Sequence, residues 1–256
     1  MNNPVDFGKT ASDYRRYRQG FPDAFFDRMF SERWVSKGDE LLDLGTGTGT
    51  LARGFASRGV KVTGLDIAAP LLDQARALSV EEGLDIHYQW GRAEETGLNS
   101  HTFDVVVAGQ CWHWFNGPVV ASEVKRLLRP GGRVVICHFD WIPLRGNVVS
   151  ATEALILQFN PRWTLFGGTG IYPRWLTDLG EAGFGGLSTG SFDVGVNYTS
   201  EAWRGRIRAS AGISASLPPE EVAHFDEAHL HMLAEKFPEP ELVIPHRVWW
   251  VTGQVG

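Results

Sequence analysis

The sequence predicts an α/β fold, with a doubly wound, mostly parallel sheet of seven strands and helical insertions over the sheet's ligand edge. Short apolar runs alternate with stretches of helical periodicity over residues 40–139. The run "FDVVVAG" at 103–109 is apolar without interruption, as in strands that are covered on both faces. Three glycines at every second position follow the first run directly. These observations together favour βαβ units joined by a glycine-rich turn.

Each expected element has its own signal in the sequence. The strands are predicted at seven runs, 40–44, 60–66, 85–90, 103–109, 133–139, 188–199 and 242–255. The first helix follows the first run, where Leu51 and Phe55 have helical spacing and Gly59 is a stop signal. The second helix begins near Pro70, and the third ends at "RPGG", residues 129–132. Two further helical stretches lie between the last two strands.

We expect the 256 residues to form a single domain with three kinds of segment. Residues 1–38 form an amino-terminal cap, and residues 39–139 form the cofactor-binding core. Two segments outside this regular part, 140–187 and 200–240, are aromatic or helical, and we expect them to be lids or insertions on the acceptor side. Ligands of doubly wound sheets bind at the carboxyl ends of the strands, which is the edge these segments would cover.

Composition excludes several classes of protein. The net charge is −6, with 24 Lys and Arg against 30 Asp and Glu, so the chain has no excess of cations for nucleic-acid phosphates. No run approaches the roughly 18 apolar residues that a membrane span needs. The start "MNNPVDFGKT" has no apolar signal segment, and the two cysteines are too few for a disulfide framework. We therefore expect a cytoplasmic protein that acts on a small molecule.

The glycine-rich segment indicates an adenosine-containing cofactor. Gly45, Gly47 and Gly49 suit a tight turn or a close approach of ligand to backbone. The dinucleotide pattern needs its third glycine one residue later, where this chain has Thr50. Asp66 lies 21 residues after Gly45, at the end of the second expected strand, where a carboxylate can accept both hydroxyls of a ribose.

Several motifs resemble one family in particular. "LLDLGTGTGTLA" resembles the first motif of the class I S-adenosylmethionine-dependent methyltransferases, and "VTGLDIA" is similar to the family's ribose motif. "GRAEETGLNSHTFDVVVAGQCWHWF" resembles the adenine loop and fourth strand of the branch related to ubiquinone-biosynthesis and trans-aconitate methyltransferases. "VKRLLRPGGRVVI" matches the passage to the fifth strand, and "ASDYRRYRQGFP" resembles the branch's amino-terminal segment. The resemblance implies a Rossmann-like methyltransferase fold with S-adenosylmethionine as cofactor.

The resemblance also implies roles for individual residues. Asp43 would orient the loop and help to hold the methionine ammonium, and Asp66 would hold the ribose. Arg92 stands where the family often has an acidic residue, so adenine contact passes to its neighbours. The cofactor contacts implied in this way are Tyr14, Arg18, Asp43, Gly45, Thr46, Gly47, Gly49, Asp66, Ile67, Ala93, Glu94 and Gln110. For Tyr14 and Arg18 the alternative is an exposed amphipathic helix.

The segment after the fourth strand is the expected acceptor side. Trp112, His113, Trp114 and Phe115 are consecutive, so their side chains cannot all face one way, and about half of them should belong to the core. His113 is the candidate catalytic residue, either a proton acceptor or an orienting donor, and the alternative is a structural hydrogen bond. Further candidates on the acceptor side are His138 and Trp141.

The predicted reaction is methyl transfer by in-line displacement to a small organic acceptor. A base is needed only where the acceptor must lose a proton. Arginines in the 140–187 segment could bind an anionic acceptor, namely Arg145, Arg162 and Arg174. Two alternatives stay open, a protein of the same fold that binds the adenosyl cofactor without chemistry, and a nicotinamide-dependent oxidoreductase.

Three other signals have simpler explanations. "GLSTG" has the spacing of a nucleophile elbow around Ser188, but a strand pattern follows in place of the helix that an elbow needs. Trp249 and Trp250 are expected to pack on opposite faces of the last strand. Three histidines on a late helix lack the spacing of a zinc site and are predicted to be solvated, namely His224, His229 and His231.

Overall fold

A computed structural model describes residues 20–256, so the predictions for Tyr14 and Arg18 lie outside the described residues. The described chain forms two compact units. Residues 140–171 and 193–247 form one, which we call the insertion unit, and residues 20–139, 172–192 and 248–256 form the other, the core unit. The assignment of residues 140–187 and 200–240 as lids stays a prediction.

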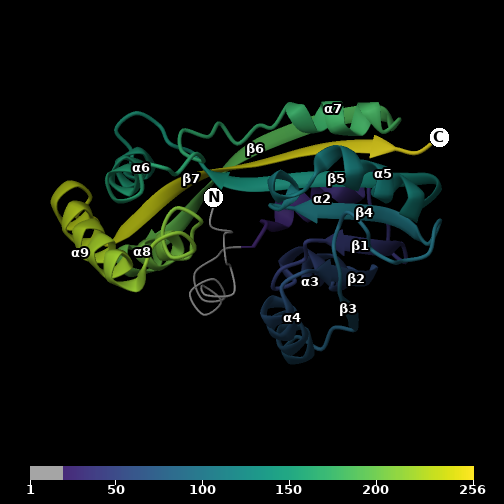
Figure 1. Cartoon of the computed structure of the whole chain (residues 1–256), viewed down its shortest axis with the longest axis horizontal. Helices are drawn as coiled ribbons and strands as arrows, with labels where there is room; N and C mark the ends of the chain where they lie inside the picture. Colours follow the sequence, from purple (N-terminus) through teal and green to yellow (C-terminus); the bar gives the residue numbers. More distant parts are fainter. Residues whose placement is uncertain (1–19) are drawn as a thin grey trace. The chain divides into compact units, whose positions relative to one another are not determined.

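Seven strands form one sheet in the order β3-β2-β1-β4-β5-β7-β6, as expected (Figure 1). Strands β1 to β5 pair in parallel, and β7 is antiparallel. Their bounds are β1 Glu40–Leu44, β2 Lys61–Asp66, β3 Ile86–Trp90, β4 Phe103–Gly109, β5 Leu128–Trp141, β6 Gly185–Thr199 and β7 Glu241–Gln254. The predicted fold class and all seven strands are therefore confirmed.

The helices of the core unit cover both faces of its sheet. They are α2 Asp23–Ser31, α3 Thr50–Ala56, α4 Ala69–Glu81, α5 Gly117–Leu127 and α7 Arg174–Glu181, with a short 3-10 helix, η2, at Trp112–Trp114. One face buries Val120 and Leu127 of α5 with Leu179 of α7 in one apolar cluster. On the other face, Phe26 of α2 packs edge to face on Phe55 of α3, with ring centroids 5.0 Å apart.

Two tryptophans of β7 confirm that the sheet has two buried faces. Trp249 packs beside Trp175 of α7, with ring centroids 5.5 Å apart. Trp250 packs against Phe25 of α2 at 6.3 Å. Both indoles are nearly inaccessible to solvent. Successive side chains of a strand point to opposite faces, so these neighbours enter different layers of the core.

Residues 129–132, where a helix end was expected before a strand at 133–139, are part of that strand. Helix α5 ends at Leu127, and β5 begins at the next residue, so "RPGG" lies inside β5. Gly131 has a φ of 75°, and its N–H donates to the carbonyl oxygen of Val255 at 3.1 Å. The prediction of a helix end was right. The extended conformation after it depends on hydrogen bonds to the far end of the chain, which local propensity does not show.

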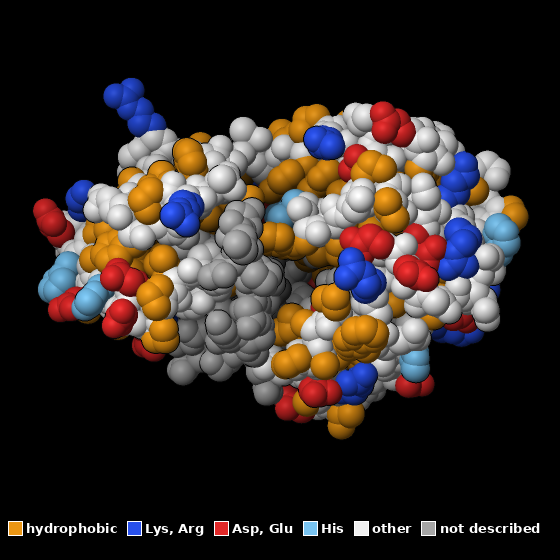
Figure 2. Space-filling model, in the orientation of Figure 1, with side chains coloured by type: hydrophobic (Ala, Val, Ile, Leu, Met, Phe, Trp, Pro, Cys, Tyr) orange, Lys and Arg blue, Asp and Glu red, His pale blue; other side chains and the backbone are white. Residues whose placement is uncertain are grey.

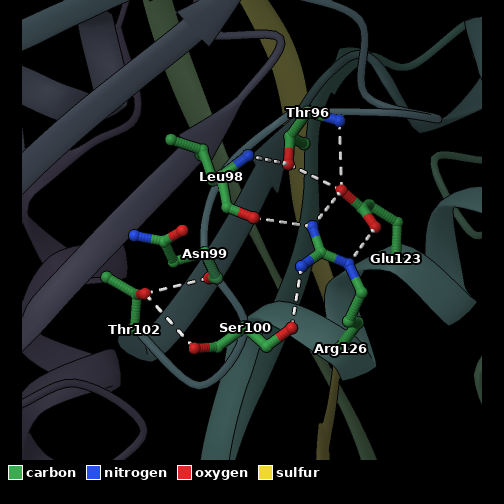
Figure 3. A network of polar contacts seen from close by, with 7 residues as sticks. All are labelled: Thr96, Leu98, Asn99, Ser100, Thr102, Glu123 and Arg126. Atoms are coloured by element: carbon green, nitrogen blue, oxygen red, sulfur yellow. Dashed lines mark hydrogen bonds and ion pairs between the residues drawn. The ribbon is translucent and has the colours of Figure 1, made fainter.

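The loop between β3 and β4 is tied to α5 by a charged network (Figure 3). The carboxylate of Glu123 accepts from the N–H and the hydroxyl of Thr96, at 3.0 and 2.6 Å. Arg126 donates to Glu123 and to the carbonyl oxygen of Leu98. Hydrogen bonds from Arg126, with those from Thr96, lower the pKa of Glu123 to about 2. The network fixes the loop that follows the expected adenine residues.

The insertion unit has an apolar core of its own. Its helices are α6 Val148–Phe159, α8 Ser200–Arg208 and α9 Pro219–Lys236, and its largest buried side chains include Trp203 and Phe225. The prediction for His229 is wrong, because this side chain is fully buried in that core. His229 lies one helical turn after Phe225, on the buried face of α9. No helix among residues 20–256 is both long and apolar enough to cross a membrane.

Candidate active site

The glycine-rich segment forms the turn between β1 and α3. Gly45, Gly47 and Gly49 have φ angles of 65°, 56° and 78°, in the left-handed region that disfavours residues with a Cβ. A Cβ on Gly45 would lie 2.8 Å from the sulfur of Cys111, closer than packing permits. Alternate glycines therefore allow the chain to reverse tightly at the carboxyl end of β1, with Gly49 as the residue that precedes α3.

Asp43 lies beneath this turn and is almost completely buried, with 1% of its surface exposed. The hydroxyl of Thr46 donates to its Oδ2 at 2.7 Å. Burial raises the pKa of Asp43 to about 7, and the charge of Asp66 adds to the rise. A cation bound near this carboxylate would favour its ionised form. The bond to Thr46 supports the predicted role of Asp43 in orienting the loop, and its contact with the methionine ammonium stays a prediction.

Asp66 joins the turn to the end of β2. Its Oδ2 accepts the N–H of Gly47 at 2.8 Å, and its Oδ1 accepts the N–H of Ala68 at 2.8 Å. Burial raises the pKa of Asp66 as well. Each carboxylate oxygen has two lone pairs, so these backbone bonds leave acceptor capacity for a pair of ribose hydroxyls. The same side chain therefore stabilises the loop and presents acceptors at the edge of the sheet.

Exposed apolar side chains lie next to Asp66. Ile67 is 56% exposed and Trp90, the last residue of β3, is 60% exposed. The indole N–H of Trp90 donates to the carbonyl oxygen of Ile67 at 2.8 Å, which holds the two residues together. Water would be displaced from these surfaces by a flat ring such as adenine. The sequence interpretation missed Trp90, although an aromatic residue at the carboxyl end of a strand was a readable signal.

The expected adenine loop presents few side-chain atoms. Ala93 is 5% exposed and belongs to the main apolar cluster. Glu94 accepts the N–H of Asn116 at 3.3 Å and pairs with Arg92 at 3.5 Å. Arg92 is therefore an exposed partner of Glu94. Cofactor contact by Ala93 and Glu94 stays a prediction.

Gln110 follows β4 with a φ of 58°, an uncommon value for a residue with a side chain. Its N–H donates to the carbonyl oxygen of Cys137 at 2.9 Å, and its side-chain amide donates to that of Phe139 at 2.8 Å. Both bonds are to β5. Gln110 thus closes the end of the β4–β5 pair, and its predicted cofactor contact is not tested by this geometry.

The aromatic segment divides between core and surface, as expected. Trp112 is 2% exposed, and its indole N–H donates to Oδ2 of Asp178 on α7 at 2.9 Å. Phe115 is half-buried against the same apolar cluster. His113 and Trp114 are exposed, with their rings 4.6 Å apart. His113 and Trp114 are therefore the exposed members of this segment, and their place on the acceptor side stays a prediction.

His113 is hydrogen-bonded to a second histidine. His138, near the end of β5, is buried, and its Nε2 lies 3.4 Å from Nδ1 of His113. The other ring nitrogen of His138, Nδ1, lies 3.3 Å from the hydroxyl of Tyr172. The Tyr172 ring stacks on Trp175 with centroids 4.2 Å apart and an angle of 6° between the planes. The structure therefore brings together both predicted histidines and adds Tyr172, which carried no sequence motif.

Trp141 belongs to the insertion unit. Its indole N–H donates to Oε1 of Glu153 at 2.8 Å, and the guanidinium of Arg206 lies over its ring at 4.8 Å. Burial raises the pKa of Glu153. The N–H of Trp141 thus has a protein acceptor within its own unit, which a structural role explains. Its predicted place on the acceptor side stays a prediction.

Comparison with known proteins identifies the class. Residues 42–136 match the family model described as "Methyltransferase domain". The chain is 32% identical over 193 residues to an uncharacterized methyltransferase of Schizosaccharomyces pombe, an alignment that covers 69% of this chain and 71% of that protein. It therefore belongs to the class I S-adenosylmethionine-dependent methyltransferase family.

More distant relatives support the expected branch and the fold. A ubiquinone biosynthesis O-methyltransferase of Aeromonas salmonicida is 31% identical over 147 residues, covering 57% of this chain and 62% of that protein. The alignments with the first five curated relatives span 51–62% of their own lengths. A solved structure from Anaeromyxobacter dehalogenans, described as a type II methyltransferase, has a TM-score of 0.63 at 21% identity and covers 93% of this chain and 97% of that one.

Proposed function

We propose that the protein binds S-adenosylmethionine at the carboxyl ends of β1, β2 and β3 and catalyses methyl transfer to a small organic molecule. The observation that carries the proposal is the carboxylate of Asp66, which accepts the N–H of Gly47 and faces the edge beside Ile67 and Trp90. This arrangement combines ribose acceptors with an apolar surface for adenine. Asp43 and Asp66 together supply the negative charge that a ligand with a sulfonium and an ammonium would meet.

The bound cofactor would supply an activated methyl group, and the chain's residues would align the acceptor with the S–CH₃ axis. His113 and Trp114 are the exposed candidates for that alignment. The buried Trp112 and half-buried Phe115 fix the backbone of the segment that carries them. Rate acceleration by alignment and exclusion of water needs no metal and no covalent intermediate.

A small acceptor suits the surface better than a polyanion. On the face shown in Figure 2, Lys and Arg are interspersed with Asp and Glu among exposed apolar side chains. Arg145, Arg162 and Arg174 are all exposed, and each could contact an anionic group on an acceptor. These three residues lie in different units, Arg174 in the core unit and the other two in the insertion unit. Their participation is part of the proposal.

Calorimetric titration tests the cofactor assignment before any acceptor is known. We expect binding of S-adenosylmethionine and of S-adenosylhomocysteine and no binding of NAD. Binding of NAD alone would support the oxidoreductase. A second assay follows transfer of labelled methyl from S-adenosylmethionine to a panel of carboxylates, phenols and amines. Cofactor binding without transfer to any member of the panel would favour the binding protein without chemistry.

A further inference from the structure

The hydrogen-bonded chain Tyr172–His138–His113 determines which nitrogen of His113 carries a hydrogen. Both nitrogens of His138 are within hydrogen-bond distance of a neighbour, Nδ1 of the Tyr172 hydroxyl and Nε2 of Nδ1 of His113. A neutral imidazole has one N–H donor and one acceptor nitrogen. A neutral chain of these three groups therefore has only two polarities.

In one polarity Tyr172 donates to His138, and Nε2–H of His138 donates to Nδ1 of His113. The hydrogen of His113 is then on Nε2, on the side of the ring away from His138. In the opposite polarity His113 donates to His138, His138 donates to the oxygen of Tyr172, and Nε2 of His113 is an acceptor. Only the second polarity would make His113 a general base, because a base needs an available lone pair.

The chemistry of the three groups favours the first polarity. A phenol is a strong hydrogen-bond donor and a weak acceptor, whereas the unprotonated nitrogen of imidazole is a strong acceptor. In this polarity both histidines also carry their hydrogen on Nε2, which is the preferred position in an isolated neutral histidine. The stacking of Tyr172 on Trp175 holds the phenol in place to donate.

We propose that Tyr172 and His138 are positioning residues that fix His113 as a hydrogen-bond donor, through Nε2–H, to an oxygen of the methyl acceptor. This inference rests on the proposed function. It specifies the acceptor as a molecule with an anionic or carbonyl oxygen beside the site of methylation, such as a carboxylate or a phenolate. A carboxylate is already nucleophilic at neutral pH, so its methylation needs no base. A protonated amine would present hydrogens to the N–H of His113 and be disfavoured.

Other titratable groups on the surrounding elements have their own partners. Asp178 of α7 accepts the indole N–H of Trp112. Cys137, beside His138 on β5, is fully buried, and burial raises the pKa of its thiol well above the usual value. From β7, the ring packed against Tyr172 is that of Trp249, with centroids 5.8 Å apart. Asp178 is thus engaged by Trp112, and Trp249 adds an apolar ring beside Tyr172.

Nitrogen NMR of the full chain, labelled with ¹⁵N-histidine, tests the polarity without any acceptor. We expect the neutral forms of His113 and His138 to carry the hydrogen on Nε2. In Tyr172→Phe, which keeps the stacked ring, His138 loses its donor and the hydrogen of His113 should become distributed over both nitrogens. Tyr198→Phe is the matched control. It removes the hydroxyl of another buried tyrosine, whose ring stacks on a different histidine, His246. It should leave the signals of His113 and His138 unchanged.

A neutral His113 with its hydrogen on Nδ1, or signals unaffected by Tyr172→Phe, would overturn the proposal. Turnover supplies a second test. A donor acts in both the neutral and the charged form, so kcat with a carboxylate, measured at saturating S-adenosylmethionine, should be the same at pH 6 and pH 8, and a kcat that rises with pH would contradict the donor role. Calorimetry separates this from failure of the proposed function, because Tyr172→Phe should bind S-adenosylmethionine like the wild type.

Discussion

The loop edge of the core unit, which is the carboxyl end of β1 and β2 with the glycine turn, and the interior of the insertion unit both bury titratable side chains. Burial shifts their pKa values in opposite directions. At the loop edge, Asp43 and Asp66 are buried near each other, and burial raises the pKa of both. In the insertion unit, burial lowers the pKa of His229 and of His246 to about 4. The carboxylates lie at the carboxyl ends of β1 and β2, around the glycine turn, whereas the histidines are enclosed by packed side chains.

The partners of these groups differ as well. Asp66 accepts hydrogen bonds from the N–H groups of Gly47 and Ala68, and these bonds fix the loop that we propose binds the cofactor. His229 has one polar side-chain partner, Thr152, whose hydroxyl lies 3.1 Å from Nε2 and also accepts the indole N–H of Trp203. Thr152 therefore serves both side chains, because a hydroxyl has one hydrogen to donate and two lone pairs to accept with. The comparison indicates that a buried carboxylate with lone pairs still available is typical of a binding site. A buried neutral histidine that is enclosed by packed side chains is typical of a core.

The largest effect is expected in the insertion unit on acidification. The folded-state pKa of each histidine is below its unfolded value of about 6.5, so stability is present above pH 6.5 and is lost as the pH falls towards 4. Between pH 7 and pH 5 each histidine should cost about 2 kcal/mol. Hydrogen-exchange protection factors of the amides in α6, α8 and α9, corrected for the intrinsic exchange rate at each pH, measure this loss.

A variant in α9 makes the acid prediction specific. His229→Gln can still form a hydrogen bond with Thr152 and does not titrate, so about half of the pH dependence should disappear. His231→Ala, on the exposed side of the same helix, is the control and should leave it unchanged. Equal protection factors at pH 7 and pH 5 in the wild-type protein would show that the buried histidines do not limit stability.

The next effect concerns Asp66 at the loop edge. Asp66→Asn keeps the size of the side chain and loses its charge, so binding of S-adenosylmethionine should weaken by about 1.5–3 kcal/mol, the range for hydrogen bonds to charged groups. Discrimination against a 2′-deoxyribose analogue should largely vanish in the variant, as calorimetry would show. If discrimination persists, another residue contacts the sugar.

His113 should have an effect of similar or smaller size on turnover. His113→Ala removes one donor to a charged oxygen, for which we expect a loss of about ten- to hundredfold in kcat/KM and unchanged cofactor affinity. His87→Ala, an exposed histidine on β3, is the control. A loss beyond about 10³-fold, together with a rate that rises with pH, would instead indicate general-base catalysis.

The smallest effect is the pH dependence of cofactor binding through Asp43. The ligand is cationic and should prefer the ionised carboxylate, whose pKa is about 7 in the free protein. Affinity should therefore fall about eightfold as the pH is lowered from 7.5 to 6. In Asp43→Asn this dependence should be absent. An affinity that is independent of pH in the wild-type protein would mean that the charge of Asp43 does not contribute to binding of the cationic ligand.

Local patterns in the sequence determined the fold class, all seven strands and the glycine turn, because strand runs, helical spacing and positive φ are set by neighbouring residues. They also indicated Asp43 and Asp66, whose places at the ends of β1 and β2 follow from parallel pairing. Only the tertiary structure decided that His229 is buried, that "RPGG" is part of β5, and that Trp90 holds the backbone of Ile67. It also decided that Tyr172 is linked through His138 to His113, because hydrogen bonds between residues 25 and 34 positions apart leave no periodicity in the sequence.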